Sequence, residues 1–71
     1  MMMQYSIVIQ WSDEDKTYVV SLPEFGTYAH THGDTYADAL KNAEEVLELL
    51  IESYQEQGRP LPQPKILEHA S

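Results

Sequence analysis

Two histidines that stand two residues apart are the clearest candidates for chemistry in this chain. His30 and His32 would share one face of a strand, and such a pair can ligate zinc, with Asp34 or His69 as a third ligand. The competing interpretation is a pair of surface histidines beside a turn. Because the chain contains no cysteine and no second spaced pair of ligands, we predict no metal site and no cofactor.

A run of three carboxylates, Asp13, Glu14 and Asp15, is the second candidate. Nucleases of the RNase H type gather several carboxylates around divalent metal ions, one of them typically on the first strand. Residues 5–11 carry no acidic side chain, and acids in a turn are usually only solvated. No serine or threonine has an identifiable base beside it, and no glycine loop could cradle a phosphate. We therefore predict no catalytic residues and no enzymatic activity.

Alternating apolar side chains predict two strands, at residues 3–11 and 17–22, joined by this acidic turn. Pro23 ends the second strand because it cannot donate a hydrogen bond to the ladder. A third strand is expected at Thr27–Thr31, although its apolar face is poor. Ile66 and Leu67 could add a short final strand.

A long amphipathic helix is expected next, because apolar residues recur with helical spacing across residues 36–54. Gly33 permits a backbone turn before it that a Cβ would obstruct. Thr35 can cap the helix, and the Asp38 carboxylate can reach back to the Thr35 amide. Gly58 supplies the left-handed residue that commonly ends a helix.

These elements predict an α+β fold in which the helix packs across a small antiparallel sheet, in the order β-β-β-α with a possible short fourth strand. Residues 1–71 form a single domain, with a core at 3–58 and a proline-rich extension at 59–71. A chain this short buries only about 60% of its unfolded surface, and without cysteine it has no disulfide to compensate. We therefore expect a homo-oligomer.

The charge balance is strongly acidic, with 12 acidic against 4 basic residues and a net charge of −8. Such a chain is repelled by phosphate backbones, so we expect no direct binding to nucleic acid. Its field would attract basic partners, or the charge serves solubility alone. Without a signal-peptide pattern or an apolar run of about 20 residues, we expect a soluble, cytoplasmic protein that does not enter a membrane.

The order of a Leu22-Pro23 turn, a Gly33-Asp34-Thr35 helix start and a Pro60-x-Pro62 exit resembles the HicB family of antitoxins, from Tyr5 to about Lys65. The resemblance implies a truncated RNase H-like β-β-β-α-β domain. It also implies a partner, HicA, a small basic mRNA interferase. Many members continue into a DNA-binding module, which would begin about where this sequence reaches Ser71, so operator binding is not carried over.

Two functions follow as expectations. The first is an antitoxin-type module that covers the RNA-binding surface of a basic HicA-like toxin. The alternative is a stand-alone homo-oligomeric adaptor or structural protein without a toxin partner.

Aromatic side chains around a turn are hard to bury in a small domain, so the predicted partner-binding residues lie near the second turn. They are Glu24, Phe25 and Tyr28. Asp13, Glu14 and Asp15 would add long-range attraction. Most of the remaining large aromatic residues are expected in the core: Trp11, Tyr18, Tyr36 and Tyr54.

Overall fold

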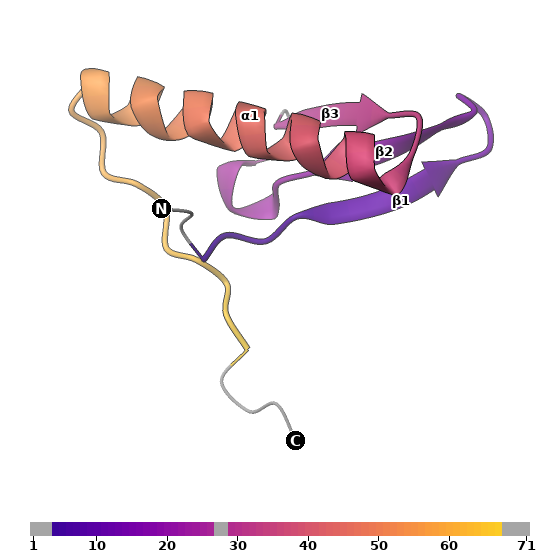
Figure 1. The fold of residues 1–71 in the computed structure, drawn as a ribbon. Helices are drawn as coiled ribbons and strands as arrows, with labels where there is room; N and C mark the ends of the chain where they lie inside the picture. The colour runs from indigo at the N-terminus through magenta and orange to yellow at the C-terminus, as the bar shows by residue number, and fades with distance from the viewer. Residues whose placement is uncertain (1–3, 27–28, 68–71) are drawn as a thin grey trace.

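The chain folds as three strands followed by one long helix, as the computed structural model shows for residues 4–26 and 29–67 (Figure 1). The elements are β1 (Val8–Ser12), β2 (Thr17–Ser21), the single-turn 3-10 helix η1 (Pro23–Phe25), β3 (His30–Gly33) and α1 (Tyr36–Glu56). The predicted α+β class and β-β-β-α order are confirmed. No helix in the described part of the chain combines the length and apolar character needed to cross a membrane.

The sheet is antiparallel throughout, in the order β1-β2-β3. Ile9 pairs with Val20, and Val20 pairs in turn with Thr31. The predicted first strand, 3–11, is too long at its start, because the amide of Ser6 donates to the Glu24 carboxylate instead of to a strand. Residue 3 lies outside the described residues.

The third strand lies later than predicted. It runs over His30–Gly33 rather than 27–31, and residues 27 and 28 lie outside the described part. Ala29 is buried, and its carbonyl accepts from Leu22 just before the ladder of β2 and β3 begins. The alternation of small and polar residues in this segment carried too little apolar signal to fix the boundary.

Helix α1 begins at the predicted residue, and its cap is visible. Thr35 Oγ1 accepts a hydrogen bond from the amide of Asp38 at 3.0 Å, which satisfies one of the free donors at the helix start. The return bond of a capping box, from the Thr35 amide to the Asp38 carboxylate, is absent between these two described residues. Ala39, Ala43 and Leu47 form the buried stripe of the helix.

Gly33 sets how closely the helix start approaches the sheet. A Cβ on Gly33 would lie 2.7 Å from Ala39 Cα and 2.8 Å from the carbonyl carbon of Asp38. The space is therefore filled by helix backbone, which cannot move aside as a side chain can. The glycine is needed for this close contact rather than for the turn itself.

The helix lies over β2 and β3 and barely over β1 (Figure 1). Beneath it the core consists of a few residues, three of them alanine: Tyr5, Val20, Leu22, Ala29, Ala39, Ala43 and Leu47. The helix-facing side of β1 is consequently left partly uncovered.

After α1 the chain turns at Gly58 (φ 66°) and returns past the first residues as an extended segment (Figure 1). Tyr5 Oη donates to the carbonyl of Pro62 at 2.6 Å. Ile66 and Leu67 are 56% and 89% exposed, and residues 57–67 add no fourth strand to the described sheet. The remainder of the predicted extension, 68–71, lies outside the described residues.

Candidate functional site

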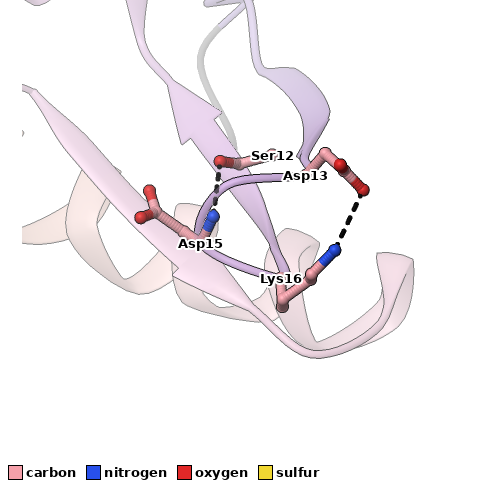
Figure 2. A network of polar contacts seen from close by, with 4 residues as sticks. All are labelled: Ser12, Asp13, Asp15 and Lys16. Atoms are coloured by element: carbon pink, nitrogen blue, oxygen red, sulfur yellow. Dashed lines mark hydrogen bonds and ion pairs between the residues drawn. The ribbon is translucent and has the colours of Figure 1, made fainter.

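The acidic turn between β1 and β2 projects from one end of the sheet (Figure 2). Asp13 Oδ1 lies 3.2 Å from Lys16 Nζ, and the Asp15 amide donates to Ser12 Oγ at 3.2 Å. Lys16 adopts the left-handed conformation, with φ at 56°, which lets the turn close onto the paired residues Ser12 and Thr17. The turn is thus held by its own backbone and polar side chains.

The carboxylates of this turn do not converge on a common point. Figure 2 shows Asp13 directed toward Lys16 and Asp15 directed away from that pair. Both side chains of the Lys16–Asp13 pair are highly exposed, so the pair adds little stability. Asp13, Glu14 and Asp15 are therefore available to a charged partner, but their arrangement does not gather them around a metal ion.

The two histidines lie on the sheet face that α1 does not cover. His30 and His32 are both exposed and line a shallow hollow with Thr17, Val19 and Asp15. Within residues 4–26 and 29–67, no cluster of three or more His, Cys, Asp or Glu side chains could hold a metal ion. His69, the other ligand considered, lies outside the described residues.

Glu24, predicted to contact a partner, is occupied within the chain. Its carboxylate accepts from the amide of Ser6 at 3.1 Å, from the Ser6 hydroxyl at 3.0 Å and from the amide of Lys65 at 2.9 Å. One half-buried side chain therefore ties the segment before β1 and the C-terminal extension to the second turn. We call this arrangement the Glu24 clasp.

The hydrogen bonds of the Glu24 clasp shift the pKa of the Glu24 carboxyl group. Partial burial favours the neutral carboxyl and opposes the change, but hydrogen bonds from the backbone of Lys65 and from Ser6 outweigh it, so the pKa of Glu24 is lowered. The charged form is thus the one the fold stabilises. The same carboxylate and the surrounding burial raise the pKa of Tyr5, with burial the larger cause and Tyr54 a smaller one.

Phe25 packs within the molecule. Its ring meets the edge of Tyr5 at a centroid distance of 4.8 Å and that of Tyr54 at 5.6 Å. Arg59 then covers Tyr54, with Cζ 4.2 Å from the ring centroid. Of the three residues predicted at the second turn, Glu24 therefore holds the C-terminal extension, Phe25 packs against Tyr5 and Tyr54, and Tyr28 lies outside the described residues.

A different set of aromatic side chains is exposed. Trp11 is 50% and Tyr36 65% exposed, so these two depart from the expectation that most of the large aromatic residues belong to the core. Tyr18 lies between them, 5.1 Å from the Trp11 ring and 4.4 Å from the Tyr36 ring by centroids. Burial raises the pKa of Tyr18, and Tyr36 beside it adds to the shift.

The alternation of apolar and polar side chains correctly places Trp11 on the helix-facing side of β1. It does not predict which strands the helix covers, so the exposure of Trp11 could not be predicted from the sequence. The signal in the sequence was an aromatic residue, Tyr36, at the first helical position. We call Trp11, Tyr18, Tyr36 and the 44% exposed Leu40 the aromatic ridge.

Comparison with known proteins gives one family. Its model, described as HicB_like antitoxin of bacterial toxin-antitoxin system, matches residues 5–71. No curated protein and no solved structure matches the chain.

Proposed function

The chain belongs to the HicB-like antitoxin family of bacterial toxin–antitoxin systems, and from this premise we propose that it neutralises a small basic HicA-like mRNA interferase by covering the toxin's RNA-binding surface. The protein acts by binding and is not an enzyme. Because its target cleaves mRNA, the two proteins meet in the cytoplasm. The β-β-β-α order agrees with a truncated RNase H-like fold, which is part of the same proposal.

The observation that carries the proposal is the distribution of exposed negative charge. The acidic turn extends from one end of the sheet, and the solvent face of α1 presents a row of exposed carboxylates: Glu44, Glu45, Glu48, Glu52 and Glu56. With a net charge of −8, this surface complements a protein face built to bind RNA phosphates. An acidic protein placed on that face excludes RNA both by charge and by volume.

The arrangement of the acids also favours binding over catalysis. β1 carries no carboxylate, and Asp13 and Asp15 are directed apart. A two-metal nuclease needs carboxylates that share their metal ions across a few ångströms. Binding a basic partner needs only that the charges be exposed.

The test is an RNA-cleavage assay with purified components. A purified HicA-like interferase should degrade a reporter RNA, and a stoichiometric amount of the acidic chain should stop the cleavage. Unchanged cleavage in the presence of excess acidic chain contradicts the proposal. A peptide with the same composition in scrambled order controls for simple charge effects.

The small core favours a second candidate, a homo-oligomeric adaptor without a toxin. Three of the seven buried apolar residues are alanines, so folding buries little large apolar surface in one copy. Association of copies through the uncovered sheet face would add what the core lacks. Absence of a neighbouring gene for a small basic protein, with stable self-association in sedimentation, favours this candidate over the first.

A further inference from the structure

The aromatic ridge is an apolar surface that the fold exposes although the sequence places it on the helix-facing side of the sheet. Trp11 and Tyr18 are paired residues on β1 and β2, and Tyr36, the first residue of α1, packs against Tyr18. The three rings form a continuous ladder, of which the outer two are at least half exposed. Tyr18, the middle ring, is half-buried and packs against the core, so the solvent-exposed part of the ladder consists of Trp11 and Tyr36.

The orientation of α1 explains why this side stays open. Ala39 packs against Gly33, and Asn42 Nδ2 donates to the carbonyl of His32 at 2.7 Å, so this flank of the helix faces β3. Leu40 and Glu44, one turn apart, lie on the opposite flank, toward β1. The aromatic ridge therefore extends from β1 to the flank of α1 that carries the Glu44 carboxylate.

We propose that the aromatic ridge is the docking site for an arginine-bearing basic segment of the toxin partner. This inference rests on the proposed antitoxin function, because it names where on this chain the toxin binds. A guanidinium stacks on aromatic faces and pairs with carboxylates at the same time. The ridge offers both, since the acidic turn begins two residues after Trp11 and Glu44 lies beyond Leu40.

The chain already contains one example of this contact. Arg59 stacks over Tyr54 at 4.2 Å from the ring centroid, at the other end of the helix. At the ridge Trp11 and Tyr36 are at least half exposed, and Arg59, which already covers Tyr54, is the one arginine in the sequence. An arginine for this ladder must therefore come from another molecule.

Charge decides between a basic partner and a second copy of this chain. Two copies would bring two acidic turns and two charges of −8 together around the ridge, and these repel. RNA itself is excluded for the same reason. The opposite sheet face carries the exposed His30 and His32 beside Val8 and Val19, and it offers no aromatic ring on which a guanidinium could stack.

Trp11, the one tryptophan in the sequence, serves as the reporter. An arginine hexapeptide titrated into the full chain should change its emission, and a lysine hexapeptide should bind about threefold or more weakly because ammonium stacks poorly on rings. Tyr36→Ala with Leu40→Ala should weaken the arginine peptide about tenfold. Leu49→Ala, 64% exposed and on the opposite side of α1, is the matched control and should leave it unchanged.

An unchanged emission, or equal weakening by the ridge variant and the control, overturns the ridge as the site. The RNA-cleavage assay separates this failure from that of the proposed function. If Trp11→Ala with Tyr36→Ala protects RNA from the toxin as well as the intact chain does, the ridge is wrong and the antitoxin function stands. If the intact chain binds the arginine peptide at Trp11 but does not protect RNA, the ridge is a binding site for basic segments. Its assignment to the toxin is then wrong, together with the proposed function. Circular dichroism confirms that each variant is folded.

Discussion

Glu24 accepts hydrogen bonds from two segments that lie far from it along the chain. It sits in η1, yet its carboxylate accepts from Ser6, 18 residues earlier, and from Lys65, 41 residues later. A charged acceptor forms stronger hydrogen bonds than a neutral one, particularly where water is partly excluded. One side chain thus fixes two segments that have no strand or helix of their own.

Replacing Glu24 by Gln should lower the free energy of unfolding by about 1 to 2 kcal/mol at pH 7, because the charge-assisted acceptor is lost while one neutral oxygen remains. Since folding lowers the pKa of Glu24 from its ordinary 4.5, the stabilisation is present above that value and disappears as the pH falls through the folded value. The difference between the two proteins should therefore shrink as the pH falls below 4.5. Urea unfolding at pH 7 and in acid measures both effects.

Glu56→Gln is the matched control, because it removes one carboxylate from an exposed position at the end of α1. It should change stability little at either pH. A Glu24→Gln protein that unfolds in parallel with the control across the whole pH range would show that the clasp contributes nothing to stability.

At the scale of elements, the junction between β3 and α1 decides how the helix lies on the sheet. Gly33 lets the first turn of the helix approach the strand, and Thr35 caps that turn. The close contact brings the flank of Ala39 against β3, and α1 covers β3 and β2 more than β1. Trp11 on β1 is left half exposed.

Gly33→Ala should destabilise the protein by about 2 to 3 kcal/mol, because the new Cβ would overlap the helix backbone at Asp38 and Ala39 and the junction must shift. Gly58→Ala is the comparison. A Cβ there meets nothing within 4 Å, so only the positive φ of 66° is strained, at about 1 kcal/mol. Thermal unfolding should rank the two variants in this order. The reverse ranking would mean that the junction can relax at little cost.

The sequence was sufficient for the elements whose signal is local. The helix from Tyr36 to Glu56 follows from apolar spacing and a capping threonine, and the hairpin follows from alternation around an acidic turn. It was insufficient where the outcome depends on distant contacts. The first strand starts late because Glu24 holds Ser6, and Trp11 is exposed because of where the helix crosses the sheet.

At the scale of the whole molecule, a small core is combined with a high charge of one sign. The largest fully buried side chains of the described core are Leu22, Leu47 and Val20. Eight excess negative charges add self-repulsion to a chain that already buries little apolar surface. A basic partner would reduce this repulsion and cover the exposed rings of Trp11 and Tyr36. Binding of the partner should therefore raise the free energy of unfolding of this chain.

The position of the charge, and not only its amount, should determine association with the toxin. Asp13→Asn, Glu14→Gln and Asp15→Asn together remove three negative charges beside the ridge, and Glu48→Gln, Glu52→Gln and Glu56→Gln remove three along α1, so both variants go from −8 to −5. Electrostatic attraction weakens beyond a screening length of about 10 Å at 0.1 M salt. The turn variant should therefore lose more affinity for the toxin than the α1 variant, and its affinity should depend little on salt. Calorimetry at two salt concentrations measures both. Equal losses in the two variants would assign the attraction to net charge alone and remove the turn from the binding surface.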